Sequence, residues 1–163
     1  MLLSIVLGLL FGLAGTSTSG VTVALPLLAD GLGVDTAVAT WMVSGYAVAL
    51  AVATPVHGRL ADAVGIRVPL CVGVGLLGLG ALAAAAAPSF GLLMAARIVQ
   101  GLGAASVPVL ASALLSARTP PERRGGVLGR LAGISAALSA LGPLIGGALT
   151  TVGGWRAAVA LPV

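Results

Sequence analysis

One arginine lies inside a long apolar segment of this 163-residue chain, where the sequence reads Arg97-Ile98-Val99-Gln100-Gly101. A guanidinium in hydrocarbon is costly, so such a residue faces a bundle interior or a water-filled cavity and usually serves a function. Gln100 follows three residues later, on nearly the same face of a helix as Arg97. The pair predicts a buried polar site. The alternative is that Arg97 lies close enough to the membrane surface to extend its head group to the interface.

A second polar stretch, residues 58–67, separates two apolar segments. Gly58 and Gly65 allow a tight reversal of the chain. Asp62 can accept hydrogen bonds from free backbone N–H groups at a helix end, or lie near the positive end of another helix. Together with Arg67, these residues predict a short loop at a membrane face. The alternative is that the stretch only orients the chain in the membrane through its arginines.

A third motif lies in the last long apolar segment and reads Gly142-Pro143-Leu144-Ile145-Gly146-Gly147. A proline inside a helix removes one backbone hydrogen bond. The adjacent glycines allow a second helix to approach closely. The motif predicts a kinked membrane helix that packs tightly against a neighbour, and an ordinary kink without further function is the alternative.

The composition explains where these motifs must lie. The chain is 59% hydrophobic and only 7% charged, whereas soluble domains carry about 25% charged residues. Lipid must therefore be the solvent for much of the surface. We predict an all-α, polytopic membrane helix bundle.

The same composition argues against several other functions. Aromatic residues make up 3% of the chain, which is too few for a surface that stacks nucleic-acid bases. Cys71 is the single cysteine, and no cluster of Cys and His suits a metal ion. No Ser/His/Asp set or pair of acids within the apolar segments suggests an enzyme. We therefore predict no enzymatic activity, no cofactor, no metal and no nucleic-acid partner.

About 20 residues of helix cross the hydrocarbon core, and five apolar runs reach this length. The first run lacks the basic start of a cleaved signal peptide, so we expect it to be retained as a helix. We treat residues 1–163 as one domain. The expected helices cover about residues 4–29, 38–57, 68–87, 91–117 and 127–152, with an incomplete sixth over residues 155–163.

The charges predict the orientation. Cytoplasmic loops of membrane proteins retain an excess of basic residues. The expected outer loops contain Asp30, Asp35 and Arg156. The expected inner loops contain six arginines: Arg59, Arg67, Arg118, Arg123, Arg124 and Arg130. This distribution predicts a cytoplasmic N-terminus, and His57 is expected at the inner interface.

In this order, the three motifs resemble those of the major facilitator superfamily of transporters. Residues 58–67, Gly-x-x-x-Asp-x-x-Gly-x-Arg, resemble its signature loop between the second and third helices. Residues 97–101, Arg-x-x-Gln-Gly, resemble a motif of its proton-coupled drug exporters, and residues 142–147 resemble the exporter marker of its fifth helix. Shorter stretches are similar to the fourteen-helix drug:proton antiporter branch: residues 23–26, 41–46 and 154–156.

The resemblance implies the N-terminal half of an antiporter that exports a small, amphipathic or drug-like compound in exchange for protons, as in multidrug and antibiotic resistance. It implies proton coupling by Arg97, Gln100 and Gly101. It implies a gating loop made by Gly58, Asp62, Gly65 and Arg67. It implies a role in alternating access for the kinked exporter motif, Gly142, Pro143, Gly146 and Gly147. It assigns no residue to substrate binding.

The chain departs from the family pattern at two positions. Ile66 stands where a second basic residue is usual in the signature loop. Ser17 stands where the first helix of the antiporter branch usually carries an aspartate. No expected span therefore has a carboxylate near its centre.

The expected partners are the lipid bilayer, protons, a small-molecule substrate, and either a C-terminal half or a second copy of this chain. The expected location is the plasma membrane, as a multi-pass protein. The absence of lysine indicates a GC-rich genome, and we expect a bacterial source. The alternative function is that of a truncated or accessory membrane protein that packs with a partner and transports nothing.

Overall fold

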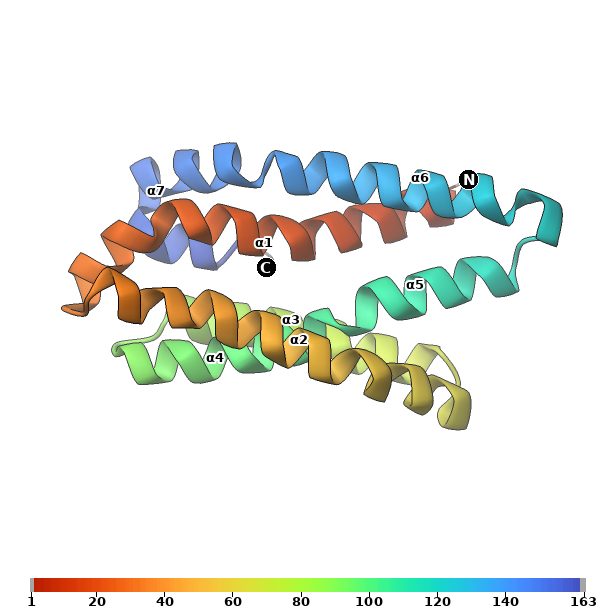
Figure 1. Ribbon diagram of the computed structural model, residues 1–163, viewed down its shortest axis with the longest axis horizontal. Helices are drawn as coiled ribbons and strands as arrows, with labels where there is room; N and C mark the ends of the chain where they lie inside the picture. Colours follow the sequence, from red (N-terminus) through yellow and green to blue (C-terminus); the bar gives the residue numbers. More distant parts are fainter. Residues whose placement is uncertain (1, 162–163) are drawn as a thin grey trace.

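The computed structural model describes residues 2–161, which form seven α-helices and no strand (Figure 1). Their bounds are α1 (Leu2–Leu32), α2 (Thr36–Val64), α3 (Arg67–Ala85), α4 (Phe90–Ala104), α5 (Ser106–Ala117), α6 (Pro121–Ala140) and α7 (Gly142–Val159). Five stretches are long and apolar enough to cross a membrane: Leu3–Leu32, Thr36–Val64, Arg67–Ala85, Phe90–Ala117 and Pro121–Val159. The predicted all-α membrane bundle is confirmed.

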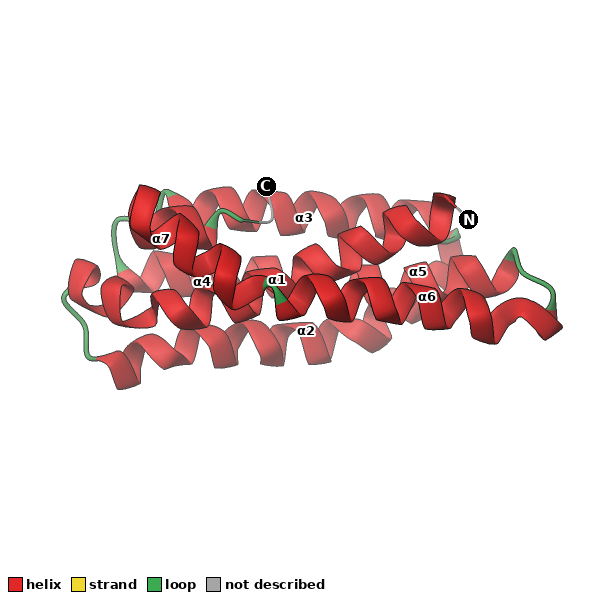
Figure 2. Cartoon of the chain, turned by 90° about the horizontal axis from the view of Figure 1, so that it is seen from above, coloured by secondary structure: helices red, strands yellow, loops and turns green. Residues whose placement is uncertain are grey.

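The helices run along one common axis in two layers. α1 packs against α6 and α7, and α4 packs against α2 and α3. Figure 1 shows α1, α6 and α7 in one layer and α2 to α5 in the other, and Figure 2 shows the connections between spans at the two ends of the bundle. The α2–α3 and α5–α6 connections lie at the end where α1 begins (Figure 1). The six arginines of the predicted inner loops are therefore carried by one end of the bundle.

The predicted loop over residues 58–67 is wrong in extent. α2 continues to Val64, so only Gly65 and Ile66 join it to α3. Gly65 has a φ of 84°, and its N–H bonds to the Ala61 carbonyl at 2.9 Å. The polar residues before Gly65 are compatible with a helix, and the chain leaves the helix at Gly65, a glycine that tolerates positive φ.

The predicted first loop is also too long. α1 reaches Leu32, so Asp30 belongs to a helix. Gly33, with a φ of 63°, ends α1. Asp35 then caps α2, because its Oδ1 accepts the Ala37 N–H at 2.7 Å.

Two predicted helices are interrupted. The helix expected over residues 91–117 is divided at Ala105 into α4 and α5, and the one expected over 127–152 begins at Pro121 and is divided at Leu141. Gly154, with φ 68° and ψ −170°, interrupts α7 where the sequence places the end of the fifth span. After Gly154 the chain turns back along the bundle (Figure 1).

The division before α7 follows from Pro143, which has no N–H to donate to the Ser139 carbonyl. The Ser19 hydroxyl of α1 donates to this carbonyl instead, at 3.0 Å. The Thr16 hydroxyl, one turn earlier on α1, donates to the Leu138 carbonyl at 3.2 Å. Side chains of α1 therefore satisfy backbone groups at the kink, as lipid cannot.

Glycines bring α1 and α7 close together. A Cβ added at Gly146 would lie 2.5 Å from the Cα and the carbonyl oxygen of Gly20, neither of which can turn away. We expect Gly146→Ala to lower the melting temperature in detergent by the equivalent of about 1–3 kcal/mol, the usual cost of overpacking.

Gly147→Ala is the matched control, because the added Cβ meets only Val23 Cγ1, at 3.9 Å. The two variants share the gain in helix propensity, so their difference reports the contact between α1 and α7. Equal melting temperatures for the two variants would contradict this packing.

The grouping of arginines predicts the sidedness of the chain. In a background with Cys71→Ala, we expect cysteines placed at Arg59 and Arg123 to be protected from a membrane-impermeant maleimide in intact cells. A cysteine at the exposed Thr36 should react. Labelling of permeabilised cells is the control for reactivity. Placement of positions 59 and 123 on opposite sides would overturn the topology.

Candidate functional site

Arg97 is the largest side chain that the described structure buries completely. Its exposed fraction is 0%. The guanidinium does not reach the surface of the bundle, so the alternative of an interfacial arginine does not hold. A buried cation needs acceptors or an aromatic face nearby, because no water solvates it.

Two polar side chains contact the guanidinium. Arg97 Nη1 donates to Gln100 Oε1 at 2.7 Å and to Ser17 Oγ at 3.2 Å. Gln100 Nε2 also donates to Ser17 Oγ, at 3.2 Å. All three side chains are fully buried. We call these residues, Ser17, Arg97 and Gln100, the arginine cluster; it joins α1 to α4.

Tyr46 of α2 completes the surroundings of the cluster. Arg97 Cζ lies 4.4 Å from the centroid of the Tyr46 ring, within the range of a cation–π interaction. The Tyr46 hydroxyl donates to the Ala14 carbonyl of α1 at 3.4 Å. Sequence reasoning assigned Tyr46 no role at this site. The available signal was that it is the only tyrosine and lies in an apolar span.

Two nitrogen atoms of the guanidinium form no hydrogen bond with the arginine cluster. Arg97 Nε and Nη2 are buried and have no hydrogen-bond partner in the described part of the chain. Unpaired buried donors are costly, and more so when they carry charge. They can bind an acceptor such as a carboxylate, a carbonyl or a water molecule. The arrangement can therefore hold a charge and bind an incoming acceptor inside the bundle.

Gly101 has a packing role beside the cluster. A Cβ there would lie 2.5 Å from the Tyr46 carbonyl oxygen. The absence of a side chain lets α4 approach α2 until the Tyr46 ring reaches Arg97. Gly80 acts similarly on α3, since a Cβ there would lie 2.7 Å from the Gln100 nitrogen.

The gating-loop residues lie apart from the arginine cluster, at the arginine-rich end. Asp62, Gly65 and Arg67 are exposed and Gly58 is partly buried. Within residues 2–161, no hydrogen bond or ion pair involves the Asp62 or Arg67 side chains. His57 is buried between helices, and its Nε2 lies 2.9 Å from the Leu102 carbonyl oxygen. Its expected position at the inner interface stays a prediction.

Two of the four exporter-motif residues pack against α1. Gly142 and Gly146 are buried against α1, where a Cβ on Gly142 would clash with Ser19 Oγ. Pro143 is exposed and Gly147 partly buried. The short polar segment of α1, residues 16–19, therefore contacts the exporter motif and its kink on one side and the arginine cluster on the other.

A shallow pocket of about 240 Å³ adjoins the Tyr46 side of the cluster. Thr18 and Tyr46 are the lining residues with polar side chains. The remaining lining residues are Phe11, Ala14, Gly15, Leu50, Ala104 and Pro108. The accessible wall is almost entirely apolar, so it suits an apolar part of a ligand better than an ionic group.

Known proteins share this sequence pattern. Residues 7–163 match the family described as Major Facilitator Superfamily. The chain belongs to the major facilitator superfamily. Its resemblance to the exporter branch, drawn above from three motifs, is supported by the names of its relatives.

The chain is 36% identical over 152 residues to the efflux pump dotC of Dothistroma septosporum, covering 93% of this chain and 26% of the relative. It is 40% identical over 138 residues to the lincomycin resistance protein of Streptomyces lincolnensis, covering 83% of this chain and 28% of the relative. It is 37% identical over 137 residues to the multidrug resistance protein Stp of Mycobacterium tuberculosis, covering 83% and 26%. The chain thus spans about a quarter of the length of these curated relatives.

Ser17 is the acceptor shared by Arg97 and Gln100, so its removal tests the geometry of this superfamily member. We expect Ser17→Ala to destabilise the protein by about 1–3 kcal/mol, because a charged donor loses its partner. The measurement is the melting temperature in detergent. Ser112→Ala is the control, since Ser112 Oγ bonds only within its own helix, to the Pro108 carbonyl. Equal melting temperatures for Ser17→Ala and Ser112→Ala would contradict the hydrogen bonds to Ser17 in the arginine cluster.

Proposed function

We propose that this chain supplies the N-terminal part of a proton-coupled exporter of small amphipathic compounds. The arginine cluster is the single observation that carries the proposal, because a membrane-spanning bundle retains a costly buried cation where function requires it. The relatives named for efflux, lincomycin resistance and multidrug resistance support export as the direction of transport.

The proposed coupling depends on an acceptor from outside the arginine cluster. The four acids of the chain lie toward the ends of the spans: Asp30, Asp35, Asp62 and Glu122. The proton-carrying carboxylate then comes from the rest of the transporter. When that carboxylate is ionised and the helices part to admit it, it pairs with Nε and Nη2 of Arg97. When it binds a proton, the pair separates and Arg97 keeps its contacts with Tyr46, Gln100 and Ser17.

Pairing and separation of Arg97 and the carboxylate give two states of the protein. The balance between these states depends on protonation of the carboxylate, which is what alternating access requires. The kink at Leu141 and the glycine contacts between α1 and α7 supply a place for the helices to bend. Asp62 and Arg67, exposed at the arginine-rich end, are free to pair with the second half in the outward-facing state. Gly58 and Gly65 complete this proposed latch.

A second half is part of the proposal, because the pocket beside Tyr46 is one wall of a cavity. In related transporters with two repeats, the substrate lies between the repeats near the bilayer midplane. The second wall comes from a C-terminal half or from a second copy of the chain. The proposed location of the assembly is the plasma membrane, with the arginine-rich end in the cytoplasm.

Transport assays can test the coupling role of Arg97. The protein is reconstituted in proteoliposomes with its second half, and an amphipathic dye such as ethidium serves as the probe. We expect Arg97→Ala to reduce dye flux driven by a pH gradient at least about tenfold, since a charge-assisted contact is lost. Dye exchange without a gradient should persist.

Arg124→Ala is the matched control, because Arg124 is exposed and bonds only to the nearby Thr119 carbonyl. Arg124→Ala should retain both the dye flux driven by a pH gradient and the dye exchange without a gradient. Full gradient-driven flux in Arg97→Ala would refute the coupling role. Equal loss of exchange and of gradient-driven flux would show that Arg97 is structural, and would also refute it.

A further inference from the structure

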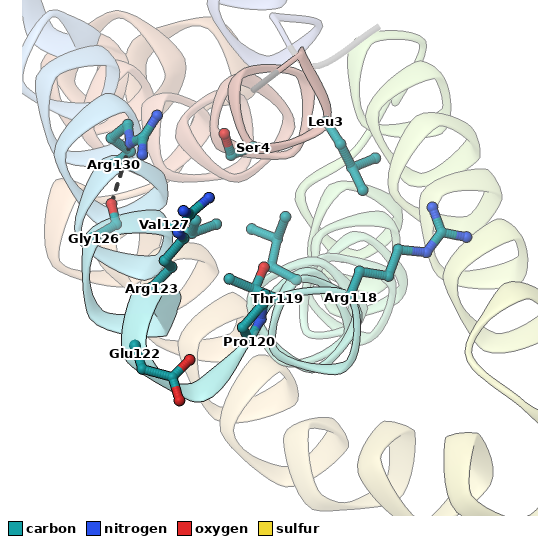
Figure 3. Close-up of a pocket in the computed structure, with 11 residues that line it drawn as sticks. Leu3, Ser4, Arg118, Thr119, Pro120, Glu122, Arg123, Gly126, Val127 and Arg130 are labelled. Atoms are coloured by element: carbon teal, nitrogen blue, oxygen red, sulfur yellow. Dashed lines mark hydrogen bonds between the residues drawn. The ribbon is translucent and has the colours of Figure 1, made fainter.

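A further pocket in the described part of the chain lies away from the arginine cluster. Its volume is about 610 Å³. It is formed by the first turn of α1, the end of α5 and the start of α6, at the arginine-rich end (Figures 1 and 3). Neither the coupling residues nor the gating loop line it, so the proposed export mechanism gives it no role.

The lining of this pocket is cationic. Arg118, Arg123 and Arg130 contribute three positive charges, and Glu122 contributes the one acid. None of these side chains forms an ion pair with another described residue within 4.0 Å. Arg123 and Arg130 lie about two turns apart on α6 and both line the pocket, and Figure 3 shows the Glu122 carboxylate pointing away from their side chains. Within residues 2–161, no ion pair neutralises these cations.

The remaining walls are largely apolar. Leu115 is buried, and Leu3 and Val127 are partly exposed in the lining. The start of α6 adds the positive end of a 20-residue helix. A cationic group of side chains beside apolar walls fits a ligand that carries an anionic head and an apolar tail.

The position of the pocket identifies the source of such a ligand. The six clustered arginines indicate the cytoplasmic side, where the membrane surface is negative because of its anionic lipids. Basic pockets between helices on this side suit phospholipid head groups. We propose that this pocket binds an anionic phospholipid, with its phosphate at Arg123 and Arg130 and an acyl chain along Leu3 and Val127.

This assignment is independent of the export proposal. Arg118, on the far side of the pocket, adds to the positive potential. A guanidinium pair suits a phosphate because each fork can donate two parallel hydrogen bonds. The bound lipid would join α1, α5 and α6 at their cytoplasmic ends.

Native mass spectrometry of the delipidated, full-length transporter tests the site. The protein is titrated with phosphatidylglycerol and, separately, with phosphatidylcholine. We expect Arg123→Gln/Arg130→Gln to weaken phosphatidylglycerol binding at least about tenfold, because two charge-assisted contacts are lost. Arg123→Lys/Arg130→Lys should keep part of the affinity, since it keeps the charge. Binding of phosphatidylcholine should be weak in every variant.

Arg59→Gln/Arg124→Gln is the matched control. It removes the same charge from the same end of the bundle, but neither residue lines the pocket. Its affinity for phosphatidylglycerol should stay within about twofold of wild type, because screened surface charges contribute little. Unchanged melting temperatures and elution volumes establish that the variants are folded.

Three results would overturn the proposal. The first is an equal loss of affinity in the pocket and control variants, which indicates a general surface attraction. The second is equal affinity for phosphatidylglycerol and phosphatidylcholine. The third is equal affinity for glycerol 3-phosphate, which lacks acyl chains, because the site would then be one for soluble phosphates.

Discussion

The burial of one guanidinium constrains the arrangement of the helices. Arg97 has no access to solvent, so its charge must be stabilised by groups that three helices bring to it. Ser17 comes from α1, Gln100 shares α4 with the arginine, and Tyr46 comes from α2. Each contact is directional, and lipid offers no substitute for any of them. A rotation of α1 or α2 that moved one partner away would expose a charge to hydrocarbon. The cluster therefore favours one relative orientation of these helices over others with similar apolar contact.

The polar segment of α1 links this cluster to the kink between α6 and α7. Ser17 faces Arg97, while Thr16 and Ser19 face carbonyls beside the kink. Thr16 also bonds to the Gly12 carbonyl of its own helix, at 2.7 Å. These neighbouring residues point to different helices because successive side chains on a helix are about 100° apart. A shift of α1 that changes the contact with Arg97 must also change the hydrogen bonds at the kink. Two regions that are separate in the sequence are thus connected through one turn of α1.

The sequence predicted the elements better than their joints. Apolar length identified the spans, and the charge of Arg97 stood out within one of them, so the pair with Gln100 could be predicted. The extent of the signature loop could not, because its polar residues also suit a helix and the backbone leaves the helix only at Gly65. The contact with Tyr46 was missed because it depends on how closely α4 approaches α2. That distance is determined by Gly101, whose packing role the sequence alone does not show.

Glycine contacts and polar contacts have complementary roles in this bundle. In lipid, burial of apolar side chains between helices contributes little, because the lipid tails are equally apolar. Close backbone approach, as at Gly20 and Gly146, increases dispersion contacts but is compatible with sliding along the helix axis. Hydrogen bonds from Ser19 and to Ser17 oppose such sliding, since they hold only at one register. Smooth glycine surfaces permit sliding, and the small number of polar contacts limits the register at which the helices stop.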